Sequence, residues 1–187
     1  MPSAATDAPA WLSDDQQRSW SSVAALLMTL PATLDAQLRA DAGLNLFEYH
    51  VLVALGDAPA RTLSMSDLAA LSRGSLSRLS HAVGRLERSG LVERTPCSVG
   101  RRRMEARLTD AGWDKLVASA PGHVAEVRRL VVDALDRGQL EAFGAAADVV
   151  VRTIDPALAC GERVRGCAPP AEPSAQPSAE PSAEQGR

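Results

Sequence analysis

Apolar residues recur every three or four positions along most of the chain, which is the spacing of one face of an α-helix. The first such stretch follows the capping residues Ser13 and Asp14. Its apolar positions are Trp20, Val23, Leu27, Leu30, Leu34 and Leu38. Pro31 lies inside this stretch, but the apolar spacing continues across it. The pattern therefore predicts one kinked helix rather than two.

Two shorter helices are predicted after it. The first begins at Asn45, a favourable capping residue, and stops near Gly56 and Pro59, which both interrupt helices. Ser64 is followed three residues later by Asp67, a spacing that resembles a capping box and predicts the start of a third helix.

A fourth helix is predicted from Ser75 to a stop at Gly90, after the turn at residues 72–74. Its buried face is predicted to consist of Leu76, Leu79, Val83 and Leu86. Its polar residues lie away from that face and are Ser77, Arg78, His81, Arg85 and Arg88. Two short helices joined by a short turn, the second with polar groups facing outward, are typical of a helix-turn-helix.

The period then changes from helical to alternating, which indicates β-strands. The strands are predicted at residues 91–95 and 104–108, and residues 96–100 have the composition of a turn. Three consecutive arginines, at residues 101–103, lie at the tip of this hairpin. A helix-turn-helix followed directly by a hairpin is the pattern of a winged helix.

Helical spacing returns after the cap at Thr109 and Asp110, and again after Asp136. The first and the last helices carry more apolar positions than the compact middle of the chain can cover, so we expect them to pack against a second copy of the chain. The predicted fold is mainly α: a winged helix-turn-helix with a small β-hairpin wing and long terminal dimerisation helices. The predicted division is a disordered N-terminus (1–11), an N-terminal dimerisation helix (12–43), a winged helix-turn-helix domain (44–109), C-terminal dimerisation helices (110–155) and a disordered tail rich in Pro, Ser, Ala and Glu (156–187).

Composition narrows the class of protein. Hydrophobic residues make up 45% of the chain, but only six residues are aromatic, so aliphatic side chains build the core, as is common in helical proteins. No apolar run approaches 18 residues, and the N-terminus lacks the pattern of a signal peptide, so we expect a cytoplasmic protein without membrane contact. Cys97, Cys160 and Cys167 are too few and unevenly spaced for a disulfide framework or a metal site.

Charge is distributed unevenly along the chain, although the net charge is only -3. Residues 61–107 contain ten Lys or Arg against four Asp or Glu, a net charge of +6, and the remainder contains ten against nineteen, a net charge of -9. A basic segment in an acidic protein is typical of nucleic-acid binding. The alternative is a solvated charged face without a partner.

No pattern of catalytic residues is present. The three histidines, His50, His81 and His123, are scattered, and no glycine-rich phosphate loop occurs. The sequence therefore predicts neither an enzyme nor a cofactor.

Residues 63–112 resemble the MarR family of winged-helix transcription regulators. The motifs that carry the resemblance are M-S-D-L-A, S-L-S-R-L-S-H, R-L-E-x-x-G-L-V-x-R, P-C-x-x-x-G-R and L-T-D-A-G, in this order and spacing. With the flanking helices, the resemblance covers about residues 12–155. It implies a homodimer with interlocking terminal helices that binds double-stranded DNA at a pseudo-palindromic operator.

The resemblance also implies the DNA contacts. The positions that match the recognition helix, which would face the major groove, are Ser75, Ser77, Arg78, His81 and Arg85. Arg101 matches the wing arginine expected in the minor groove, and Arg102 is a second wing contact. Val99 stands where the family usually has an acidic residue that holds the wing arginine, so we expect a less ordered wing.

The resemblance further implies that a small ligand relieves repression. It also implies a pocket for this ligand between the first, second and fifth helices and the winged domain. The candidates to line it are Trp20, Met28, His50 and Trp113, although such residues at helical spacing are more often part of the core. The expected function is a sequence-specific, homodimeric repressor of nearby genes. Two alternatives stay open: a dimeric protein-interaction module with weak or no specific DNA binding, and a redox sensor using Cys97, whose basic neighbours favour a reactive thiolate.

Overall fold

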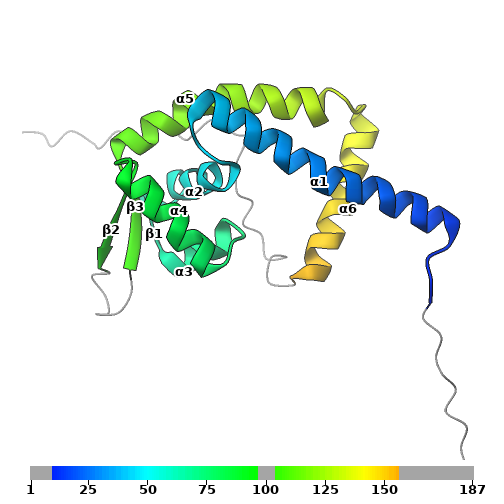
Figure 1. Ribbon diagram of the computed structural model, residues 1–187, viewed down its shortest axis with the longest axis horizontal. Coiled ribbons are helices and arrows are strands. Elements are labelled where there is room, and N and C mark those ends of the chain that lie inside the picture. The colour runs from blue at the N-terminus through cyan, green and yellow to red at the C-terminus, as the bar shows by residue number, and fades with distance from the viewer. Residues whose placement is uncertain (1–9, 97–103, 156–187) are drawn as a thin grey trace, which may run out of the picture.

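The computed structural model describes residues 10–96 and 104–155, and it is mainly helical with a small antiparallel sheet, as predicted (Figure 1). The helices are α1 (Asp14–Ala42), α2 (Leu46–Gly56), η1 (Pro59–Arg61), α3 (Met65–Leu71), α4 (Leu76–Arg88), α5 (Asp110–Val127), η2 (Arg128–Val132) and α6 (Arg137–Ile154). The strands are β1 (Thr62–Ser64), β2 (Val92–Pro96) and β3 (Met104–Leu108). The predictions for the chain ends, the hairpin tip and the three cysteines lie outside the described residues.

Helix starts coincide with the capping residues that the sequence indicated. In each case a side-chain oxygen accepts a hydrogen bond from the backbone N–H at the third helical position, which would otherwise lack a partner. The residues that cap in this way are Ser13, Asn45, Ser64, Ser75, Thr109 and Asp136. α1 runs without interruption through Pro31, so the prediction of one helix rather than two is confirmed.

The hydrophobic core surrounds α2, which is buried along most of its length, including Val51, Leu52 and Leu55. The C-terminal end of α1, helices α3 and α4, the sheet and the start of α5 cover it. Gly112, in the first turn of α5, allows this helix to approach the sheet closely, because a Cβ atom there would lie 2.1 Å from the carbonyl oxygen of Leu91. This close approach explains the glycine of the L-T-D-A-G motif.

The sheet has three antiparallel strands in the order β1-β3-β2, with β3 in the centre. Ala106 of β3 is fully buried and pairs with Leu63 on one side and Arg94 on the other. The sequence predicted only two strands. It missed β1 because three residues are too few for alternation to be recognised, and β1 exists only through its pairing with β3.

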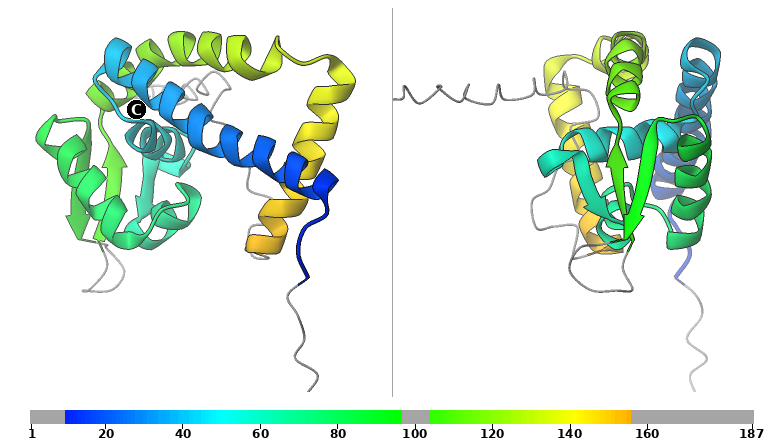
Figure 2. Two further views of the ribbon diagram at one scale, coloured as in Figure 1. Left: turned by 45° about the vertical axis from the view of Figure 1, so that its right-hand side comes forward. Right: turned by 90° about the vertical axis from the view of Figure 1, so that its left-hand side faces the viewer.

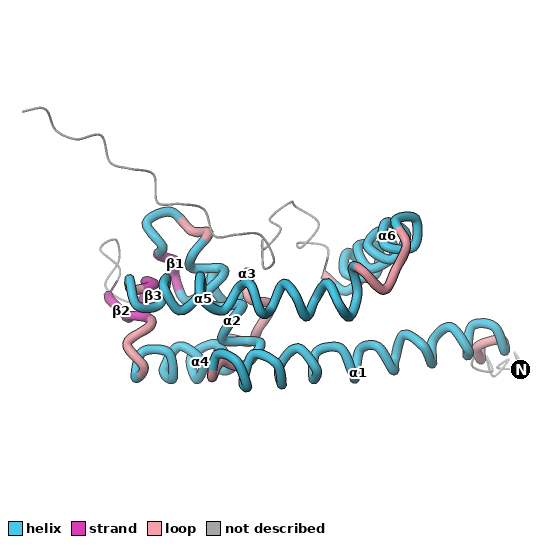
Figure 3. Tube along the Cα trace, turned by 90° about the horizontal axis from the view of Figure 1, so that it is seen from above, coloured by secondary structure: helices cyan, strands magenta, loops and turns pink. Residues whose placement is uncertain are grey.

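The molecule has two unlike ends. Helices α3 and α4 and the sheet gather at one end, whereas α6 and the N-terminal half of α1 extend at the other (Figures 1 and 2). At the end of α5 the chain passes through η2 and turns into α6, which lies apart from α1 when seen from above (Figure 3). No residue of α6 is buried, and α1 buries only Leu38 and Ala42. The outer helices therefore leave their apolar faces uncovered in the single chain.

Candidate nucleic-acid interface

Helix α4, the second helix of the helix-turn-helix, has two unlike faces. The buried face consists of Leu79, Ala82, Val83 and Leu86. The residues expected to contact DNA on this element are all exposed to solvent: Ser75, Ser77, Arg78, His81 and Arg85. The structure thus brings these five polar side chains onto the outer surface of one helix.

Leu76 does not belong to the buried face, and this part of the sequence prediction is wrong. The residue is 58% exposed. It occupies the first turn of α4 between the exposed Ser75 and Ser77, so it lies beyond the elements that cover the rest of the helix. Helical spacing identifies a residue's side of the helix but not where the neighbouring elements end.

The turn between α3 and α4 is shaped around an aromatic ring of α2. Gly74, in this turn, lies against Phe47, and a Cβ atom at residue 74 would come within 2.4 Å of the Cζ atom of the ring. Arg73, directly before it, has a φ of 54°, in the left-handed region that side chains other than glycine rarely adopt. The turn is therefore fitted closely to α2.

Arg78 lies on the face of the same ring. Its guanidinium carbon is 4.3 Å from the centroid of Phe47, which is the geometry of a cation–π contact. Among the described residues Arg78 has no partner in an ion pair, so its N–H groups are available to a ligand. Nothing in the local sequence around Phe47 indicates this contact, because Phe47 and Arg78 are far apart in the chain.

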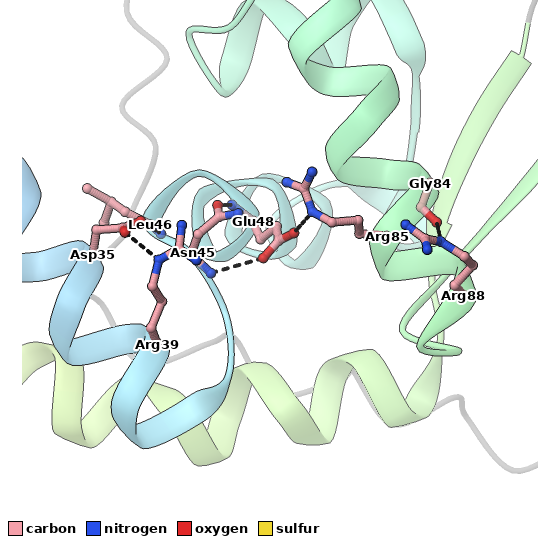
Figure 4. A network of polar contacts seen from close by, with 8 residues as sticks. All are labelled: Asp35, Arg39, Asn45, Leu46, Glu48, Gly84, Arg85 and Arg88. Carbon is pink, nitrogen blue, oxygen red and sulfur yellow. Dashed lines mark hydrogen bonds and ion pairs between the residues drawn. The ribbon is translucent and has the colours of Figure 1, made fainter.

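Arg85 lies further along α4 than Arg78, and it is held by an ion pair. Its Nε donates to a carboxylate oxygen of Glu48, a residue that is only 7% exposed. The other carboxylate oxygen of Glu48 accepts from the backbone N–H of Asn45 at 2.9 Å, as part of the capping box of α2 (Figure 4). Arg85 was expected to face the major groove; it is exposed, but one of its donors is bound to Glu48 of α2.

The same polar network continues into α1 (Figure 4). Asp35 accepts from Arg39 Nε at 2.6 Å and from the backbone N–H of Leu46 at 2.8 Å. The hydrogen bond from Arg39 is the main cause, and that from Leu46 the second, of a pKa of Asp35 below its usual value. Glu48 and Asp35 together tie α4 and α1 to the first turn of α2.

Two further basic residues near α4 differ in their partners. Arg94 of β2 pairs with Glu87, and this hydrogen bond lowers the pKa of Glu87. Arg88 donates instead to the carbonyl oxygen of Gly84 at 3.1 Å. The pair of Arg94 and Glu87 therefore links α4 to the sheet.

The wing is described only at its base, where β2 and β3 pair from Val92 with Leu108 to Pro96 with Met104. The described residues do not include Val99, Arg101 and Arg102. Their predicted roles in the wing therefore stay predictions. The base of the wing and α4 lie at the same end of the molecule (Figure 1).

The four candidates for a ligand pocket are not brought together. Trp20 and Met28 lie in the N-terminal half of α1 and are 53% and 77% exposed. Trp113 lies in the first turn of α5, where the guanidinium of Arg61 stacks on its ring at 4.2 Å. His50 lies in α2.

His50 belongs instead to a cluster between α1, α2 and α5. His123 of α5 is buried, lies 4.6 Å from Tyr49 between ring centroids, and has its Nδ1 3.4 Å from Gln37 of α1. Burial lowers the pKa of His123, with a further contribution from His50. Burial also lowers the pKa of His50, followed by the charges of Arg73 and Arg78. Both rings therefore favour the neutral form.

A cleft of about 530 Å³ opens at the junction of α1, α2, α4 and α5. The charged side chains in its wall are Arg39, Glu48, Arg85 and Lys115, and its apolar wall includes Leu44, Leu86 and Leu91. Its volume is in the range of sites for small molecules. No cluster of potential metal ligands occurs within residues 10–96 and 104–155. No helix in the described part of the chain has the length and apolar character needed to cross a membrane.

Comparisons with known proteins agree with this geometry. The family model of the MarR family matches residues 42–103. Sco3205, a MarR family transcriptional regulator from Streptomyces coelicolor solved in complex with DNA, is 39% identical over 82% of this chain and 96% of its own, with a TM-score of 0.77. AbsC, a MarR family transcriptional regulator from the same organism, is 33% identical over 79% of this chain and 99% of its own, with a TM-score of 0.75.

A more distant structure shares the fold alone. FabT of Streptococcus pneumoniae, also solved in complex with DNA, is 19% identical over 75% of this chain and 98% of its own, with a TM-score of 0.60. No curated protein matches the chain significantly. The similar structures named as MarR family proteins are transcriptional regulators and not enzymes, which confirms that part of the sequence prediction.

Proposed function

This chain belongs to the MarR family of transcriptional regulators, and on that premise we propose that it is a sequence-specific DNA-binding regulator that works as a homodimer. The observation that carries the proposal is the exposed polar face of α4, in a helix-turn-helix followed by the base of a wing. Sco3205, the 39% identical relative, was solved in complex with DNA. Sequence-specific binding, the operator and the regulatory output are the parts proposed here.

In the proposed complex α4 enters the major groove. Arg78 supplies a planar guanidinium that can pair with O6 and N7 of guanine, whereas Ser75, Ser77 and His81 contact phosphates or base edges. Arg85 contributes through its terminal nitrogens, since Nε is bound to Glu48. Arg101, with Arg102 beside it, enters the minor groove from the wing.

The homodimer is supported by the outer helices. Large apolar side chains are exposed on α1 at Trp20, Val23, Leu27 and Met28, and on α6 at Phe143, Val149, Val150 and Ile154. Exposed apolar surface of this extent is unusual in a monomer. We therefore propose that residues 12–43 and 110–155 form the dimerisation region and that residues 44–109 form the DNA-binding domain. Two α4 helices would then read half-sites about 34 Å apart, as a pseudo-palindromic operator requires.

Relief of repression by a small ligand is the last part of the proposal. The cleft beside Glu48 and Arg85 supports it better than the four residues that the sequence suggested, because its wall includes side chains of α4 itself. A molecule bound there would act if it favoured a dimer whose recognition helices no longer match successive major grooves. Ligands found by thermal-shift screening should lower operator affinity, and a bound ligand without effect on affinity would contradict this part.

The central experiment is selection of bound sites from a random duplex pool, followed by fluorescence anisotropy at several salt concentrations. We expect a Kd of about 10⁻⁸ M or tighter for a selected duplex. Arg78→Ala should relax base preference, and Arg101→Ala should weaken binding to all sequences similarly. Arg18→Ala, which removes an equal charge far from α4, is the matched control. Equal affinity for selected and random duplexes would refute specific binding.

The exposed apolar faces also favour a second candidate, a dimeric protein-interaction module with weak or no specific DNA binding. The same experiment separates the two functions. A stable dimer with no selected operator would support the module, whereas a selected motif near a promoter whose transcription rises when the protein is removed would support a repressor.

A further inference from the structure

We propose that Phe47 of α2 is a positioning residue for Arg78 and thereby determines how strictly α4 discriminates among bases. The inference rests on the proposed function, because it assumes that Arg78 reads DNA. It assigns a recognition role to a buried residue that is on neither of the DNA-facing elements, α4 and the wing.

The ring of Phe47 is fixed on more than one side. The residue is 7% exposed and belongs to the hydrophobic core. The outer end of the ring occupies the space that a side chain at residue 74 would take, since the nearest ring atom is 2.4 Å from an ideal Cβ position there. The absence of a side chain at Gly74 therefore lets the turn of the helix-turn-helix close on the ring.

The face of the ring, in turn, carries the guanidinium of Arg78 at 4.3 Å. A cation–π contact uses the flat face of the guanidinium and leaves its N–H donors in the plane free. Those donors are the groups that pair with guanine. The Arg78 side chain, although exposed, is thus held without losing the donors that recognition needs.

The contrast with Arg85 shows why this arrangement favours Arg78 as the discriminating residue. Glu48, the residue after Phe47, takes Nε of Arg85 and neutralises much of its charge. Phe47 takes neither donor nor charge from Arg78. Two consecutive residues of α2 therefore hold Arg78 and Arg85 of α4 in different ways, and of these two arginines only Arg78 keeps a complete set of donors.

Holding Arg78 before DNA arrives should improve discrimination. A free arginine side chain loses rotamer freedom when it binds, and a side chain already held loses less. A mobile guanidinium can also find alternative acceptors at a wrong base pair, which a held guanidinium reaches less easily. Removing the ring should therefore weaken the correct complex more than the incorrect ones.

The test uses the full-length protein, the operator duplex selected from the random pool, and a set of duplexes with each base pair substituted in turn. Phe47→Leu keeps an apolar core side chain but removes the aromatic face. We expect it to reduce discrimination at the positions read by Arg78 by about 3- to 10-fold, in line with the strength of cation–π contacts. Affinity for random duplex should stay within about 2-fold of wild type.

The decisive comparison is a double-mutant cycle with Arg78→Ala. If Phe47 acts through Arg78, Phe47→Leu has no further effect on the substitution profile once Arg78 is absent. Leu52→Val is the matched control, because it trims the core of the same helix and should lower thermal stability without changing the profile. Circular dichroism during heating checks that each variant is folded.

Arg78→Lys provides a second route if Phe47→Leu does not fold. Lysine keeps the charge but lacks the planar group, so we expect a similar loss of discrimination with random-duplex affinity retained. The inference is overturned if Phe47→Leu leaves the profile unchanged, if its effect is equally large without Arg78, or if Arg78→Lys discriminates like wild type. Failure of the wild-type protein to prefer any duplex would instead refute the proposed function.

Discussion

Two regions of the molecule use apolar residues in opposite ways. One is the winged-helix body, residues 44–109. The other consists of the outer helices, which are the N-terminal half of α1 together with α6. In the body, most leucines and valines of α2, α3, α4 and β2 are almost completely buried, and Leu76 is an exception. In the outer helices, residues of the same kind face solvent, as Ile154 does at 77% exposure. Both regions have well-capped helices. Local helix signals are therefore equally strong in both, and the difference lies in packing.

This difference indicates where each region obtains its stability. The core of the body is covered by elements of the same chain, so the body gains from burial within one chain. A helix without fully buried residues, such as α6, gains little from burial within one chain, and isolated helices of this length are marginal in water. We therefore expect the stability of α6 to depend on protein concentration, whereas that of the body should not.

The largest effect on stability should come from removing a buried side chain from the core of the body. Leu79→Ala removes a fully buried side chain of α4 and should lower the free energy of unfolding by about 2–5 kcal/mol. Urea denaturation measures this change, and Leu27→Ala on the outer part of α1 is the matched control. If both variants lost equal stability at a concentration where the wild type is monomeric, the contrast between the regions would be wrong.

A charge introduced on the outer helices should weaken dimerisation instead of lowering the stability of the body. Val150→Glu places a carboxylate in the exposed apolar face of α6, which an apolar contact between copies would have to desolvate. We expect the dimer Kd to rise at least about 10-fold, with little change in the unfolding of the body. Sedimentation velocity over a range of concentrations measures the Kd. Asp148→Asn, next to this face, is the control for a change of charge alone.

An effect of pH should arise in the histidine cluster, where α2 of the body packs against α5. His50 and His123 have lowered pKa values in the folded protein, so the unfolded chain binds protons more readily. Their contribution to stability is full above the unfolded value of about 6.5 and is lost as the pH falls below it through the folded values.

We therefore expect thermal stability to decrease between about pH 7 and pH 5, and to decrease less in His123→Gln. His81→Gln on the exposed face of α4 is the control, since this ring is not buried. Melting temperatures measured by circular dichroism across this range test the expectation. An identical pH dependence of wild type and His123→Gln would show that burial of the ring is not the cause.

The smallest effect should follow loss of an exposed ion pair on the outer helices. Arg137 and Glu141 lie one turn apart on α6, with an Nε to Oε1 distance of 2.8 Å, and both face solvent. Such pairs contribute at most about 0.5 kcal/mol. Arg137→Ala should therefore leave urea denaturation unchanged within error. A loss above about 1 kcal/mol would mean that this part of α6 is covered in the assembled protein.

The starts of the helices could be predicted from the sequence because N-capping is a local interaction. Ser13, Asn45, Ser75 and Asp136 each cap a backbone N–H only three residues away, so residue type and spacing suffice to locate them. The order of elements followed in the same way, and with it the winged-helix fold. The motifs from residue 63 to residue 112 led to the family that the comparisons then showed.

Contacts between distant residues were not readable in this way. Leu76 has the spacing of a core residue and is exposed, and β1 is a strand only because β3 lies beside it. The four suggested pocket residues lie on helices that do pack together, but Trp20 and Met28 belong to the exposed N-terminal half of α1, beyond that contact (Figure 2). No local signal distinguishes these cases, since burial and strand pairing depend on which elements pack together.

Arg78 and Arg85 of α4 illustrate the difference between what the sequence determines and what only the tertiary structure determines. By itself, the sequence determined that Arg78 and Arg85 lie on the outer side of one helix, because helical geometry follows from spacing along the chain. Only the tertiary structure decided that Arg78 rests on Phe47 and that Arg85 is paired with Glu48. Those partners are 31 and 37 residues away in the chain, and their side chains meet because the whole core brings α2 against α4.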